Sequence, residues 1–258
     1  MAMMAWRAAP VLTLTIRQFL GGKTARVVLA LALVPALFAL IWLVRPGDIS
    51  PRFFLVETFR NLILPTLLPI AVLLLATAAF GNELEDRTLP YLTLKPIGRW
   101  RIVLGKWIAV LVVVVPLLLA GLVAATLLAA RGPVDTASRV SNGGDLGPVL
   151  GAMAAATVAG AILLAAVFVL VSLVIPRALL AGMVYVFAWE SLLGRFLPGV
   201  QSVSIRHAAD SIFIAVLNDP AVTFAGAATL RGALLTVVIV SVVALALAAL
   251  RLRSMNLE

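Results

Sequence analysis

Residues that could do chemistry are few in this sequence. The 258 residues include no cysteine and one histidine, His207. Thiolates and imidazoles are the usual zinc ligands, so cysteine-based sites are excluded and a histidine-based metal site is not expected. Gly21-Gly22-Lys23-Thr24 matches the end of a phosphate-binding loop, but that pattern needs a glycine where this chain has Arg17. We therefore expect no metal, nucleotide or other cofactor to bind this chain.

The segment 81–106 is the most polar stretch of the chain. Its acidic arm contains Glu83, Glu85 and Asp86, its apolar tip contains Tyr91, Leu92 and Leu94, and its basic arm contains Lys95, Arg99, Arg101 and Lys106. Thr88-Leu89-Pro90 breaks the first arm, so the pattern predicts a cytoplasmic hairpin. Exposed apolar residues ringed by charge are typical of a docking surface. The alternative interpretation is a solvated helix end, with cation–lipid contacts for Arg99, Arg101 and Lys106.

A second charged pair, Glu190 and Arg195, lies near the outer end of the fifth apolar segment. Trp189 next to Glu190 indicates interface depth, where a carboxylate costs little. Glu190 is expected to pair with Arg195 or with another helix. The pair is interpreted as a structural ion pair or as part of an outer gate.

The elements that must position these residues are membrane helices. The sequence is 63% hydrophobic and 12% charged, whereas soluble domains contain roughly 25% charged residues. We predict an all-α polytopic membrane protein with a single transmembrane domain, residues 1–258. The net charge of +9 is assigned to lipid headgroups rather than to nucleic acid.

Six transmembrane helices are expected because each needs about 20 apolar residues. The predicted spans are about 27–44, 62–80, 107–130, 148–175, 178–193 and 232–250. Residues 1–26 are predicted to form an amphipathic interfacial helix. Residues 194–231 are predicted to form a short outer hairpin, either an amphipathic surface helix or a re-entrant one. Pro65 and Pro69, one turn apart, make the second span the best candidate for a bend.

The distribution of Lys and Arg predicts the orientation. They are more frequent in the segments on the side of the N-terminus than in the opposite loops. The positive-inside tendency therefore predicts cytoplasmic N- and C-termini in a multi-pass protein of the inner (plasma) membrane.

The segment "ELEDRTLPYLTLKPIGRWRIVLGK" resembles the cytoplasmic segment between the second and third spans of ABC transporter permeases of the type-2 exporter class. The shared pattern is an acidic start, a Thr-Leu step, a leucine-rich tip, a Pro-Ile-x-Arg turn and a final Gly-Lys. Its positions here are Glu83, Glu85, Thr88, Leu89, Leu92, Leu94, Pro96, Ile97, Arg99, Gly105 and Lys106. Arg87 stands where the family often has glycine. A second segment, "YVFAWESLLGRFLPGVQSVSI", resembles the region after the fifth span in one branch of the same class.

The resemblance implies a non-enzymatic permease that exports cargo with energy from a separate ATPase subunit. It implies two ATPase copies, which bind ATP and Mg, and a second permease chain, as a homodimer or heterodimer. The hairpin would contact the ATPase through Glu83, Glu85, Asp86, Arg87, Thr88, Leu89, Tyr91, Leu92, Leu94 and Arg99. The alternative is an ion-coupled carrier or channel without an ATPase. Such proteins usually place several ionisable residues in mid-span, and the predicted spans hold essentially none.

Overall fold

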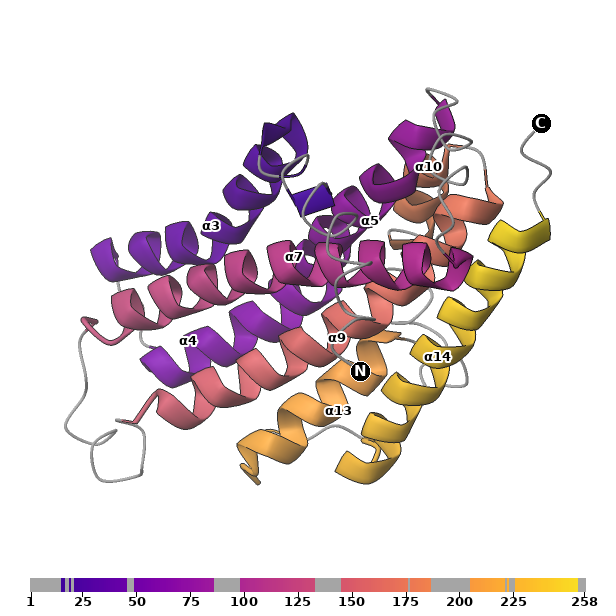
Figure 1. Ribbon diagram of the computed structural model, residues 1–258. Coiled ribbons are helices and arrows are strands. Elements are labelled where there is room, and N and C mark those ends of the chain that lie inside the picture. Colours follow the sequence, from indigo (N-terminus) through magenta and orange to yellow (C-terminus); the bar gives the residue numbers. More distant parts are fainter. Residues whose placement is uncertain are drawn as a thin grey trace, which may run out of the picture.

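The computed structural model describes residues 15–16, 19, 21–45, 49–85, 98–132, 145–175, 177–186, 205–220, 222 and 226–254. Within these residues the regular secondary structure is helical, and Figure 1 shows the helices side by side in one bundle. The helices are α3 (Lys23–Val44), α4 (Pro51–Thr58), η1 (Phe59–Leu67), α5 (Leu68–Glu85), α7 (Arg99–Ala129), α9 (Gly147–Val174), α10 (Ala178–Val184), α13 (Ile205–Leu217) and α14 (Leu230–Ser254).

Five helical segments among the described residues are long and apolar enough to cross a membrane. They are Lys23–Val44, Pro51–Phe80, Arg99–Ala129, Gly147–Val174 and Leu230–Ser254. These five contain most of the predicted spans one, two, three, four and six, and the all-α membrane fold is confirmed. In the predicted fifth span, α10 occupies the first residues, and residues 187–193 lie outside the described part of the chain.

The helices define two ends of the bundle. The inner end holds the starts of α3 and α7 and the ends of α5, α9 and α14, and the outer end holds the opposite termini. The inner end is the one that the charge distribution predicts to be cytoplasmic. In Figure 1 the ends of α5 and α14 and the start of α7 lie toward the upper right.

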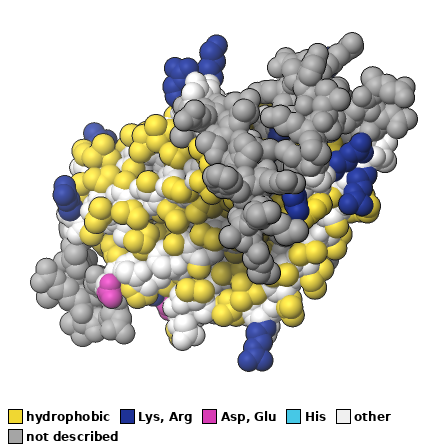
Figure 2. All heavy atoms as spheres, viewed as in Figure 1, with side chains coloured by type: hydrophobic (Ala, Val, Ile, Leu, Met, Phe, Trp, Pro, Cys, Tyr) yellow, Lys and Arg dark blue, Asp and Glu magenta, His cyan; other side chains and the backbone are white. Residues whose placement is uncertain are grey.

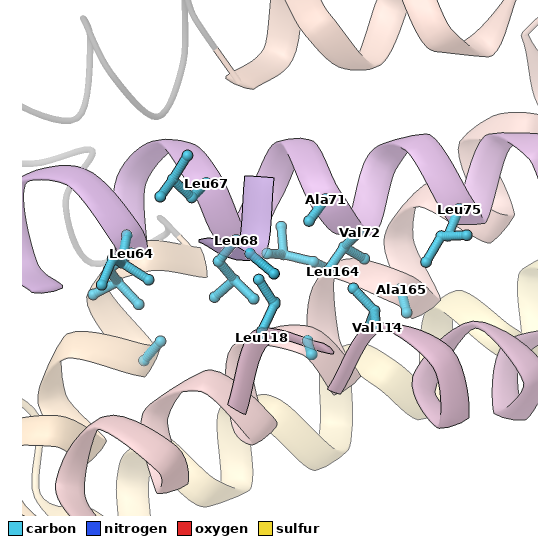
Figure 3. Close-up of a cluster of buried hydrophobic side chains, with 14 of the residues drawn as sticks. Leu64, Leu67, Leu68, Ala71, Val72, Leu75, Val114, Leu118, Leu164 and Ala165 are labelled. Atoms are coloured by element: carbon cyan, nitrogen blue, oxygen red, sulfur yellow. The ribbon is translucent and has the colours of Figure 1, made fainter. Parts of the chain in front are cut away.

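The centre of the bundle is the continuous run α4–η1–α5. In the apolar stretch of this run 72% of the residues are buried, against 28% in α3 and in α14. Figure 3 shows Leu64, Leu68 and Val72 from this run facing Val114 and Leu118 of α7, with Leu164 and Ala165 of α9 beside them. In lipid such close packing, rather than water exclusion, stabilises helix association.

The peripheral helices α3 and α14 present apolar side chains outward. Large exposed hydrophobic residues include Leu37 and Ile41 on α3 and Leu235 and Val242 on α14. On the face shown in Figure 2, hydrophobic side chains cover the middle of the bundle, and Lys and Arg lie toward its ends. This distribution is the one expected for a protein surrounded by acyl chains and two headgroup layers.

Glycine permits one especially close helix contact. A Cβ atom on Gly121 of α7 would overlap the carbonyl oxygen of Ala32 on α3. The two backbones therefore approach to a distance that only glycine allows, as small residues do at membrane helix interfaces.

The second span is longer and less regular than the sequence indicates. It begins at Pro51, ahead of the predicted Leu62, and residues Phe59–Leu67 form a π-helix that contains Pro65. Proline has no N–H to donate, so a departure from the α-helical pattern at this position has a direct cause.

Helix α13 enters the bundle instead of lying on its surface. A Cβ atom on Gly160, at the middle of α9, would be 3.5 Å from the Cβ of Ala209. Phe213 packs against Phe59 with ring centroids 4.9 Å apart. The described part of the predicted outer hairpin, α13, is therefore packed inside the bundle, and the form of the whole hairpin stays a prediction.

Candidate functional site

The polar segment 81–106 leaves and re-enters the bundle through two helices at the inner end. Its first residues continue α5 to Glu85, and its last residues begin α7 at Arg99. Residues 86–97 lie outside the described part of the chain. The described part of this site is therefore its base, where α5 and α7 meet.

Lys106 joins the two helices at this base. Its side chain is 1% exposed, and its Nζ donates a hydrogen bond to the backbone carbonyl of Ala79 on α5. The same Nζ lies 4.3 Å from the ring centroid of Phe80. A buried ammonium group is tolerated only with such hydrogen bonds and a favourable electrostatic partner, which the face of an aromatic ring supplies. We call Lys106, Ala79 and Phe80 the Lys106 clamp.

The Lys106 clamp corrects one sequence interpretation. Cation–lipid contacts were one of the two interpretations for Lys106, and that one is wrong. The register of α7 turns this residue toward α5, so its side chain is enclosed by protein. Trp107, the next residue, donates its indole N–H to the carbonyl of Ile162 on α9 at 3.3 Å.

Arg99 ties the start of α7 to the end of α14. Its Nη1 lies 3.1 Å from the carbonyl oxygen of Leu252 and 2.6 Å from that of Arg253. The last carbonyls of a helix have no intrahelical donor, and a cation at this end also interacts well with the helix dipole. The base of the polar segment is thus linked to α5, α7 and α14.

The other predicted site residues are placed only in part. Glu83 and Glu85 belong to the last turn of α5, and their side chains are not described. The remaining predicted contacts, from Asp86 to Leu94, lie outside the described residues, as do Glu190 and Arg195. Their predicted roles stay predictions.

Sequence reasoning missed two ion pairs at the outer half. Arg60 of η1 holds Asp210 of α13 through two contacts of 3.0 Å, Nε to Oδ1 and Nη2 to Oδ2. Nearer the outer end, Nη2 of Arg52 on α4 lies 2.6 Å from Oδ2 of Asp219. The four residues were assigned to outer loops. One signal in the sequence was available: the separation of Arg52 and Arg60 is similar to that of Asp210 and Asp219. Such matching separations are expected when two antiparallel segments pair.

The Arg60–Asp210 pair also corrects the expectation that ionisable residues are essentially absent from mid-span. Asp210 follows Ala209, which packs beside the midpoint of α9. No group of three or more His, Asp or Glu side chains that could hold a metal ion occurs among the residues that the structure describes.

Comparison with known proteins identifies the class of this chain. A family model described as ABC-2 family transporter protein matches residues 23–189, which is more than half of the chain. The matched region runs from α3 through α10, includes the polar segment and its base, and stops before α13 and α14. A search of curated proteins found no match. The chain therefore belongs to the ABC-2 transporter family, as a membrane permease of an ABC transporter.

Proposed function

We propose that this permease couples ATP hydrolysis by a separate ATPase subunit to the export of a cargo, through the polar segment 81–106. The observation that carries the proposal is the Lys106 clamp, because it ties the last residue of that segment to Ala79 and Phe80, which directly precede the segment. A partner that pulls on the segment would act on α5 and α7 together.

The contacts at the base support such coupling. Lys106 links α7 to α5, and Arg99 links α7 to α14. A displacement of the segment would therefore act on three membrane helices, α5, α7 and α14. ATP can shift the bundle only if the nucleotide-bound ATPase prefers one bundle arrangement over another. The Lys106 clamp would transmit a movement of the segment to α5 and α7 within the membrane.

The remaining parts of the proposal concern assembly. Two ATPase subunits bind ATP and Mg, and two permease chains, identical or related, form the pathway. The chain lies in the inner (plasma) membrane with cytoplasmic termini. The exposed cations at the inner end, Lys23, Arg26, Arg251 and Arg253, support this orientation.

The docking assignment is tested by the double variant Tyr91→Asp/Leu92→Asp. We expect the purified permease to lose its ATPase subunit and the accompanying ATP hydrolysis, because two carboxylates replace the apolar tip. Val134→Asp, in the predicted outer loop 131–147, is the matched control and should keep both. If the double variant retains its ATPase and hydrolyses ATP like the wild type, the assignment is wrong.

The family match argues against the ion-coupled alternative, but one observation makes that alternative worth a direct test. Asp210 and Arg60 form an ionisable pair inside the bundle, which is where carriers place such residues. Liposomes that contain the permease alone separate the two functions. An ABC permease should hold a proton or sodium gradient as empty liposomes do, whereas an ion-coupled carrier or channel should dissipate it without ATP.

A further inference from the structure

The outer half of the bundle contains a polar junction centred on Arg60. Its guanidinium holds both carboxylate oxygens of Asp210, and its backbone carbonyl accepts a hydrogen bond from Nη2 of Arg206 at 3.2 Å. Arg206 and Asp210 are one turn apart on α13, so one face of α13 binds one residue of η1. The family match ends at residue 189 and does not reach this helix.

The π-helix explains why this carbonyl is bound from outside η1. In the π-helical pattern the carbonyl of residue 60 would accept from residue 65, which here is a proline without an N–H. Arg206 supplies a donor instead. Pro65 thereby creates an acceptor for α13, and the guanidinium of Arg60 provides the second attachment.

The junction lies deep in the bundle. Asp210 has a side chain only 10% exposed, and that of Arg60 is 23% exposed. Ile205 and Arg206 line a small pocket together with Leu64, Leu68, Gly160 and Leu164, at the middle of α9 and of the central run. The outer pair of Arg52 and Asp219 attaches the opposite end of α13. Polar contacts therefore fix α13 at two depths.

We propose that Arg206 and Asp210 are positioning residues that hold α13 inside the bundle and close its outer half, and that α13 leaves this position during export. The second part rests on the function proposed above. Separating Asp210 from Arg60 in a dry bundle would leave two buried charges, which is very unfavourable. Once water enters along an open route, both charges are hydrated and separation becomes easy. The pair thus links the position of α13 to the exclusion of water.

The first experiment tests the junction in the permease alone. The chain has no cysteine, so Ala209→Cys gives a single reporter at a site that is 2% exposed. In lipid nanodiscs a water-soluble maleimide should label it slowly. Adding Asp210→Asn should raise the labelling rate about tenfold or more, because one charge is lost and α13 opens more often. Ala129→Cys, equally buried on α7, should stay slow with or without Asp210→Asn.

A charge exchange separates the ion pair from general damage. Arg60→Asp/Asp210→Arg keeps the pair with reversed charges and should move the labelling of Ala209→Cys back toward the slow rate. Two results would overturn the role of the pair. One is that Ala209→Cys is labelled as slowly with Asp210→Asn as without it. The other is that it is labelled as fast with the charge exchange as with Asp210→Asn alone.

A second experiment follows α13 during turnover and does not depend on changing Asp210. The Cβ position of Gly160 is 3.5 Å from the Cβ of Ala209, which is within the range of disulfides. The nearest obstacle to a side chain at Gly160 is the tip of Leu68. Gly160→Cys/Ala209→Cys should therefore cross-link readily under oxidation without nucleotide. In the purified complex with its ATPase, cross-linking should become several-fold slower during ATP hydrolysis.

The outcomes distinguish this inference from the proposed function. A complex that hydrolyses ATP but cross-links at the same rate with and without ATP overturns the movement of α13. A permease that binds no ATPase overturns the proposed function, and the maleimide experiment on the permease alone still decides whether the junction holds α13.

Discussion

At the scale of single residues, the inner end is organised by two cations with different tasks. Lys106 is enclosed and binds the backbone and ring of the neighbouring helix, whereas Arg99 reaches across to the end of α14. Both belong to the basic arm that the sequence predicts. The sequence predicted that both residues belong to a basic arm at one end of the bundle. Their partners could not be predicted, because these depend on how α7 is rotated against α5 and α14. That rotation is set by tertiary packing and not by the local pattern.

Substitutions of Lys106 test whether its ammonium group is enclosed by the bundle. Lys106→Met keeps the length and removes the charge, so we expect a loss of about 1–2 kcal/mol in the free energy of unfolding. Lys106→Glu buries a carboxylate against a carbonyl and should cost about 3–5 kcal/mol. The measurement is thermal unfolding of the purified permease in detergent.

Lys23→Met is the matched control for these variants. Lys23 is exposed at the start of α3, so its replacement should change stability by less than about 0.5 kcal/mol. A Lys106→Glu variant that melts with the wild type would mean that the ammonium group is not held inside the bundle.

At the scale of elements, the helices α3 and α7 depend on a close backbone approach. Gly121→Ala places a methyl group against the carbonyl of Ala32, so the helices must separate. We expect a loss of about 1–3 kcal/mol, as overpacking usually causes. Gly151→Ala on α9 is the control, since a Cβ there meets nothing within 4 Å. Equal melting temperatures for the two variants in detergent would contradict the described contact.

The extent of the second span shows where sequence reasoning fails. A search for about 20 apolar residues treats a charge as the end of a span. Arg52 and Arg60 therefore placed the start of this helix too late. Their carboxylate partners lie 167 and 150 residues away in the chain, so no local pattern could reveal that the charges are accommodated within the bundle. The bend expected at Pro65 and Pro69 stays a prediction, and the π-helical form of Phe59–Leu67 was not predicted.

At the scale of the whole molecule, composition and apolar runs were enough to predict an all-α membrane protein. The resemblance in segment 81–106 predicted the family that the comparison confirms. The predicted docking tip between the two arms remains a prediction, because residues 86–97 lie outside the described part of the chain. The junction at Arg60 was not predicted, because it joins segments 150 residues apart and the matching spacing of the arginines and aspartates was the one available signal.

The orientation of the whole molecule can be tested in the cysteine-free chain. Lys95→Cys, in the polar segment, should react with an impermeant maleimide only from the cytoplasmic side. Asn218→Cys, at an exposed turn of the outer end, should react only from the other side. The opposite pattern would place the polar segment beyond the reach of a cytoplasmic ATPase and would exclude the proposed function.

The links between distant segments have a consequence for biogenesis. Arg99 precedes its acceptor Leu252 by 153 residues, and Arg60 precedes Asp210 by 150. At synthesis rates of about 5–20 residues per second, each arginine is made roughly 8–30 s before its partner exists. During that interval the nascent permease must keep unmatched guanidinium groups in or near the lipid. Cells that stall or truncate translation before α13 should therefore accumulate chains in which both arginines lack their partners and in which both ends of the bundle are accessible to membrane proteases.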